Sequence, residues 1–79
     1  MTEDDILSEI SQIETFAKGT GVHIRQYLNS RYGRGNWRKC KGIALVRDDF
    51  DYPRLAEIHW FEAHGIGRQD FKRKRWLDE

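Results

Sequence analysis

The chain has 79 residues, a formal net charge of +1 and 38% hydrophobic residues, which suit one small domain spanning residues 1–79. Cys40 is the only cysteine, so no intramolecular disulfide and no thiolate zinc site are expected. The start is acidic, and no apolar run approaches the ~20 residues that span a bilayer, so we expect a cytoplasmic protein with no membrane partner. A chain this short buries a modest core, which predicts a monomer or a weak dimer.

The charges are strongly segregated along the chain. Residues 1–16 contain five acidic residues and no Lys or Arg, whereas residues 17–47 contain eight basic residues and no Asp or Glu. An electric field depends on where the charges lie and not on their sum. The middle third of the chain therefore favours an anionic partner.

Two helices are predicted at the N-terminus. Over residues 3–18, apolar residues recur at helical spacing, namely Ile6, Ile10, Ile13 and Ala17. Thr2 and the early carboxylates suit a helix start, and Gly19 suits its end. A second, weaker amphipathic pattern over residues 22–32 ends at Gly33 and predicts another helix.

The rest of the chain predicts strands. Residues 37–47 and 54–63 alternate in polarity, and the Asp- and Pro-containing stretch 48–53 joins them as a hairpin. Residues 71–77 also alternate and predict a third strand, with a short helix as the open alternative. The expected fold is α+β, with two N-terminal helices followed by a three-stranded antiparallel meander sheet. The first helix should pack on the strand face of Ala56, Ile58 and Trp60.

The basic middle third also carries aromatic rings. Cations neutralise phosphates and release counterions, and rings between them can stack on unpaired bases. With two later cations added, the predicted nucleic-acid-binding residues are Arg31, Arg34, Trp37, Arg38, Lys39, Lys41, Arg68 and Lys72. An equally weighted alternative places the rings in the core and leaves the cations to keep the protein soluble.

A second group of residues suggests acid–base chemistry. In a metal-independent ribonuclease, His59 and His64 would act as acid and base, and Glu57 would orient one of them. The favoured alternative is two half-exposed histidines paired with neighbouring carboxylates. The spacing of His59, Glu62 and His64 matches neither zinc-protease motif, so no metal and no cofactor are expected.

The string AEIHWFEAHGIGR at residues 56–68, preceded by Trp37-Arg38-Lys39 and Lys41-Gly42, resembles a small family of uncharacterised bacterial proteins. This resemblance covers residues 32–77 and implies no activity. Separately, two helices before a meander sheet are similar in order to the RelE-like and colicin-type ribonuclease toxins. That similarity is one of architecture alone, so no residue role is carried over.

The sequence therefore predicts a small intracellular RNA-directed domain that binds single-stranded RNA. The more specific form of this prediction is a metal-independent ribonuclease. The alternative is a non-catalytic domain whose acidic first helix and aromatic surface dock a protein partner. The separation of His59 and His64 helps to decide, because a distance beyond ~10 Å with no basic group between them excludes a shared acid–base site.

Overall fold

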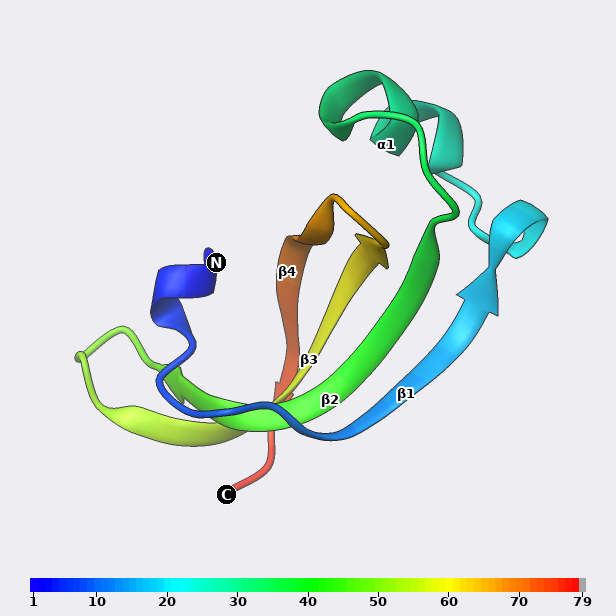
Figure 1. The fold of residues 1–79 in the computed structure, drawn as a ribbon. Coiled ribbons are helices and arrows are strands. Elements are labelled where there is room, and N and C mark those ends of the chain that lie inside the picture. The colour runs from blue at the N-terminus through cyan, green and yellow to red at the C-terminus, as the bar shows by residue number, and fades with distance from the viewer. Residues whose placement is uncertain (79) are drawn as a thin grey trace.

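A computed structural model describes residues 1–78, which form a four-stranded antiparallel sheet and one α-helix (Figure 1). The strands neighbour one another in chain order and are β1 (Ser11–Lys18), β2 (Arg38–Arg47), β3 (Pro53–Ala63) and β4 (Gly67–Trp76). The helix between β1 and β2 is α1 (Arg25–Tyr32), and short 3₁₀ turns are η1 (Glu3–Asp5) and η2 (Gly19–Gly21).

The predicted first helix and the three-stranded sheet are wrong, whereas the helix predicted over residues 22–32 forms as α1. Most of residues 3–18 is extended and adds a fourth strand, β1, at the sheet edge. β-branched and aromatic side chains such as Ile13, Thr15 and Phe16 favour a strand over a helix. The misleading spacing has a local cause: Gln12 has a φ of 52° where β1 shifts register against β2. The extra residue of such a bulge lengthens the same-face spacing from two to three, which imitates a helix.

The predicted hairpin of residues 37–47 and 54–63 is confirmed. β2 and β3 pair without interruption from Arg38 opposite Glu62 to Arg47 opposite Pro53. At the turn, the Asp48 side chain accepts hydrogen bonds from the backbone of Phe50 and Tyr52, at 2.8 and 3.0 Å. The C-terminal segment is a strand and not a helix, and it starts at residue 67, earlier than predicted.

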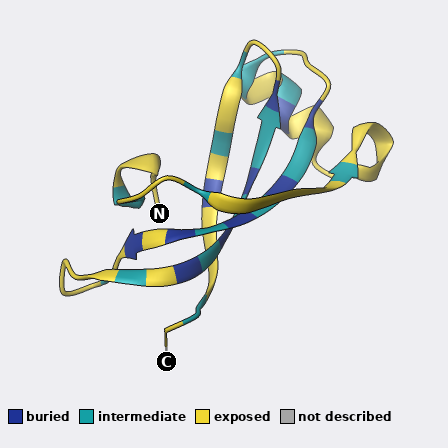
Figure 2. Cartoon of the chain, turned by 60° about the horizontal axis from the view of Figure 1, so that its bottom comes forward, coloured by how far each residue is buried: buried dark blue, intermediate teal, exposed yellow. Residues whose placement is uncertain are grey.

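The main core lies on one face of a strongly bent sheet (Figures 1 and 2), called here the core face. Its buried side chains are Cys40, Ala44, Val46, Ala56, Ile58, Trp60 and Phe71. The extended N-terminal segment crosses this face, with Ile6 bridging to Val46 and Ile10 packed nearby. The Trp60 face is therefore buried as predicted, but an extended segment covers it in place of a helix.

A second cluster lies beneath α1, at one end of the opposite sheet face. It consists of Val22, Leu28, Trp37 and Ala63. The Trp37 indole donates a 3.0 Å hydrogen bond to Asn29 of α1, and the Tyr32 hydroxyl donates to Asp70 of β4. These contacts tie α1 to the sheet and leave the rest of that face uncovered by a helix.

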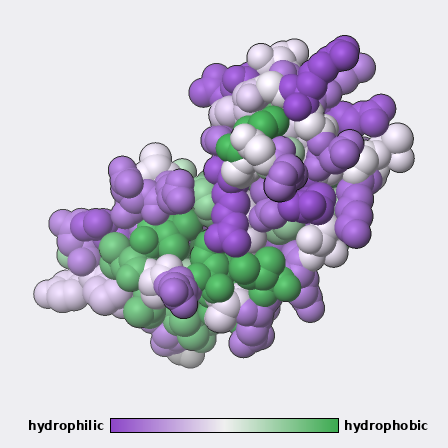
Figure 3. All heavy atoms as spheres, in the orientation of Figure 1, coloured by the Kyte–Doolittle hydropathy of each residue, from purple (hydrophilic) through white to green (hydrophobic). Residues whose placement is uncertain are grey.

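In Figure 3, the α1 end of the molecule is mostly hydrophilic, while apolar residues gather lower down, where the N-terminal segment crosses. Leu7 and Ile13 contribute to the exposed apolar surface, and their exposed fractions are 42% and 46%. Within residues 1–78, no helix has the length and apolar character needed to cross a lipid bilayer.

Candidate nucleic-acid interface

One row of side chains crosses all four strands on the face opposite the core face. Residues that lie directly opposite one another in a sheet share a face. Lys41 lies opposite Glu14 on one side and His59 on the other, and His59 lies opposite Lys72. The surface around this row is called here the cationic face and consists of Glu14, Phe16, Lys39, Lys41, Glu57, His59, Lys72 and Arg75.

The Glu57 carboxylate joins a histidine and an arginine within this face. Its Oε2 lies 2.7 Å from His59 Nε2, and its Oε1 accepts a hydrogen bond from Arg75 Nε at 3.2 Å. The hydrogen bond from His59 lowers the pKa of Glu57, and the hydrogen bond and charge of Arg75 act the same way against the opposing effect of burial. Glu57 is therefore kept in its ionised form, and both of its carboxylate oxygens have a partner on this face.

Lysine side chains on this face lie beside aromatic rings. The Lys39 ammonium is 5.3 Å from the ring centre of Phe16 and 5.6 Å from that of Phe61. The Lys41 ammonium lies 6.0 Å from the Phe16 ring centre and 3.4 Å from Glu14 Oε2. A shallow hollow of about 200 Å³ lies beside them and is lined by Gln12, Glu14, Lys41, Gly42, Ile43, Glu57 and Arg75. The hollow shares Lys41 and Glu14 with the group around Phe16, and among residues 1–78 no aromatic ring lines it.

The two predicted catalytic histidines do not come together. His59 lies inside β3, whereas His64 lies in the exposed turn after that strand ends at Ala63. The rise of a strand places residues 59 and 63 roughly 13 Å apart. His59 Nε2 is bound to Glu57, and among the described residues its buried Nδ1 has no hydrogen-bond partner. Both ring nitrogens of His59 are therefore withheld from a substrate, and His64 is too far away to act with this ring.

The predicted binding residues Arg38 and Arg68 lie elsewhere, around Glu62. Arg38 Nη2 is 2.7 Å from Glu62 Oε2, Arg68 Nε is 3.5 Å from Oε1, and the Trp60 indole donates to Oε1 at 2.7 Å. Burial alone would raise the pKa of Glu62, but the hydrogen bonds from Trp60 and Arg38, together with both guanidinium charges, lower it overall. Both arginines therefore pair with Glu62 on the core-face side of the sheet and not on the cationic face.

The other predicted binding residues are divided between the core, the helix and the cationic face. Trp37 is 1% exposed and belongs to the cluster under α1, so it offers no ring to a ligand. Arg31 donates to the Tyr32 hydroxyl at 3.1 Å, and Arg34 is exposed in the loop after α1. The cationic face brings together three of the predicted cations, namely Lys39, Lys41 and Lys72.

Three residues of the cationic face, namely Glu14, Phe16 and Arg75, were not predicted from the sequence, and the first two lay inside the predicted helix. Phe16 lay inside the predicted helix, which concealed its position on a strand. Simple alternation puts Lys72 and Arg75 on opposite faces, but β4 shifts register against β3 between Glu57 and Ile58, and both side chains reach the same face. A register shift of this kind has no clear signal among consecutive Lys and Arg residues.

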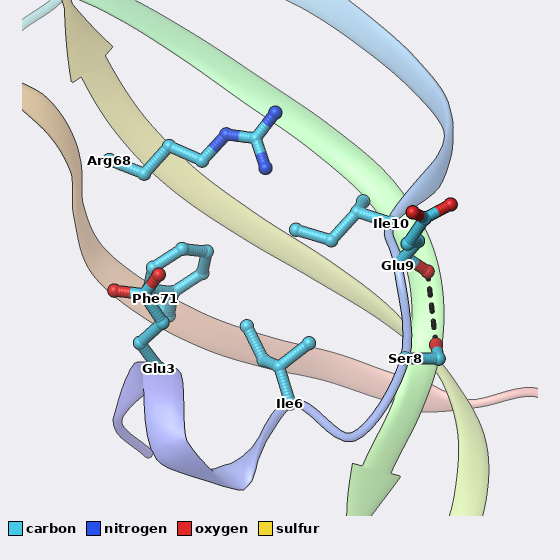
Figure 4. A pocket seen from close by; sticks show the side chains of 7 residues that line it. All are labelled: Glu3, Ile6, Ser8, Glu9, Ile10, Arg68 and Phe71. Carbon is cyan, nitrogen blue, oxygen red and sulfur yellow. Dashed lines mark hydrogen bonds between the residues drawn. The ribbon is translucent and has the colours of Figure 1, made fainter.

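A second hollow, of about 350 Å³, lies on the other side of the sheet between the N-terminal segment and β4 (Figure 4). Ile6, Ile10 and Phe71 form an apolar floor that continues the main core. Arg68 lines it together with the carboxylates of Glu3 and Glu9. Because its walls carry both signs of charge, this hollow favours no single class of ligand.

Comparison with protein-family models, with curated proteins and with solved structures gives no significant match to this chain. The resemblance of residues 56–68 to a bacterial family therefore stays a prediction. The function of the chain is inferred from its own residues.

Proposed function

We propose that the cationic face binds RNA through its phosphates. One observation carries the proposal: β2 contributes Lys39 and Lys41, and β4 contributes Lys72 and Arg75, to a single sheet face. Cations gathered on one surface attract a polyanion and release its counterions on binding.

Two of these cations are available for a ligand. Glu14 lies beside Lys41, and Glu57 beside Arg75, so these pairs are partly neutralised. Among residues 1–78, neither Lys39 nor Lys72 takes part in an ion pair. These two lysines can bind phosphate oxygens by charge-assisted hydrogen bonds without first displacing a carboxylate.

The type of surface favours RNA over double-stranded DNA. The face of a four-stranded sheet is too broad to enter the major groove of a duplex, which admits a helix or a two-stranded ribbon. Four-stranded sheets that present rings and cations bind unpaired RNA in other proteins. This general likeness of surface supports the proposal without implying a shared family.

The test is fluorescence anisotropy with a short labelled single-stranded RNA at increasing salt. Replacing Lys39, Lys41 and Lys72 together by Gln should weaken binding and flatten the salt dependence by about 2 in log–log slope, at about 0.7 per lost phosphate contact. The matched control replaces Lys18, Arg25 and Arg34, which are exposed outside this face, and removes the same charge. This control should keep the slope of the wild type.

A change of opposite sign sharpens the test. Glu14→Gln removes the carboxylate beside Lys41, so RNA affinity should rise. An equal loss in both triple variants would show that only net charge matters, and the proposed face would be wrong. Absence of binding at low salt would favour a protein-interaction domain, which would have to use an extended acidic segment because the predicted acidic helix does not form.

A further inference from the structure

Phe16 occupies a special position on β1. The register of β1 against β2 shifts between Thr15 and Ala17, so Phe16 is the extra residue of a β-bulge. A bulge re-aims a side chain relative to a regular strand. Here the ring reaches the cationic face, where its centre lies 5.2 Å from that of His59 in an edge-on arrangement.

The Phe16 ring contacts its neighbours on the cationic face but is not part of the hydrophobic core. Phe16 is 46% exposed, and neither core cluster includes it. Phe61 lies on the same side of the sheet, but it is half-buried and packs against the cluster under α1. About half of the Phe16 side chain is therefore in contact with water, between two lysines, where a ligand can reach the ring.

The surroundings of Phe16 match what an unpaired nucleotide requires. A base needs a flat apolar surface to stack on, and its phosphates need cations within a few ångströms of that surface. Lys39 and Lys41 hold their ammonium groups 5.3 and 6.0 Å from the centre of the Phe16 ring. An aromatic ring and two cations, the two elements that bind unpaired nucleotides, therefore lie together at this point of the face.

We infer that Phe16 is the residue on which an RNA base stacks, and that it makes the cationic face prefer single-stranded over double-stranded RNA. The inference rests on the proposed function and specifies its substrate. Bases inside a duplex already stack on one another, so only an unpaired base can use the ring. Phosphate contacts alone give no such preference.

The test compares Phe16→Ala, Phe16→Leu and Phe16→Tyr by anisotropy, each with a short single-stranded RNA and with the duplex of the same sequence. Stacking of one base predicts a loss of about 5- to 150-fold for Phe16→Ala on the single strand. Phe16→Leu should behave like Phe16→Ala, because it lacks an aromatic face, and Phe16→Tyr should bind like the wild type. The salt slope should not change, since no charge is altered.

The possible outcomes separate this inference from the proposed function. An equal loss on single strand and duplex would make the ring a support for the lysines and overturn the stacking role. Unchanged affinity of Phe16→Ala, with weakened binding of the triple lysine variant, would also overturn it while leaving the RNA-binding face in place. Thermal unfolding of each variant checks that the exposed position tolerates the change.

Discussion

Glu57 and His59 lie two residues apart on β3, and the carboxylate oxygen Oε2 lies 2.7 Å from the ring nitrogen Nε2. Residues at this spacing in a strand point to the same face, so the pair follows from the sequence. Arg75 of β4 binds the second carboxylate oxygen. The anion is thus held between two donors, and within residues 1–78 Lys39 and Lys72 are the cations of this face without a carboxylate partner.

The lowered pKa values of Glu57 and Glu62 predict a loss of stability in acid. A carboxylate whose pKa is lower in the folded state stabilises the fold above its unfolded pKa of about 4.3, and this contribution disappears as the pH falls through the folded pKa. Denaturant unfolding at a series of pH values should show the free energy of unfolding falling below about pH 4.3. Glu62→Gln should make this fall shallower, whereas the matched change at the exposed Glu9 should follow the wild type. A Glu62→Gln curve parallel to that of the wild type would contradict the assigned role of Glu62.

Gly42 should not tolerate a side chain. A Cβ atom there would lie 2.5 Å from Ile10 Cγ2 and 3.0 Å from the backbone oxygen of Ser11. Gly42→Ala should therefore lower the free energy of unfolding by about 1–3 kcal/mol, as overpacking does. Gly21→Ala is the control, since a Cβ there meets only Ala17 Cβ at 3.8 Å. Equal stability of the two variants in urea would mean that Ile10 and Ser11 do not pack against Gly42.

Trp60 is fully buried, so Trp60→Ala should lower the free energy of unfolding by about 3–5 kcal/mol. A domain of this size has little stability to lose, and much of the protein should be unfolded at room temperature. Chemical denaturation followed by circular dichroism measures the change. A thermal midpoint that moves by less than a couple of degrees would place Trp60 at the surface. Trp60→Phe keeps an apolar ring but removes the donor to Glu62. Its free energy of unfolding should therefore lie between those of the wild type and Trp60→Ala.

The sequence predicted the β2–β3 hairpin because its alternation is regular and its turn has Asp and Pro. It failed on β1, since bulges at Gln12 and Phe16 break the alternation into steps of three. Periodicity identifies a strand only where the register is continuous. The spacing of apolar residues alone could therefore not predict that the sheet has a fourth strand.

The candidate site divides along the same line. Lys39, Lys41, Glu57 and His59 lie on regular strands, and their common face could be derived from parity once the hairpin was assigned. Arg75 reaches that face only through a register shift in β4, and Phe16 lies on an edge strand whose alternation is interrupted by two bulges. Trp37 was misjudged for a different reason: an aromatic residue among cations is equally consistent with a core position, and only packing under α1 distinguishes the two.

If the cationic face binds RNA as proposed, we predict that the RNA stays intact. A two-histidine ribonuclease needs one imidazole as base and another as acid within reach of the same phosphodiester. Here His64 lies beyond the end of β3, Nε2 of His59 is bound to Glu57, and Nδ1 of His59 is buried. Incubating the wild type with a mixed-sequence RNA from acidic to mildly basic pH, with and without EDTA, should leave the RNA at full length on a gel. His59→Ala and His64→Ala, purified in parallel, reveal any contaminating nuclease. Cleavage by the wild type with a bell-shaped pH dependence near the imidazole pKa of ~6.5, lost in both variants, would contradict the prediction and require the turn at His64 to close over the cationic face.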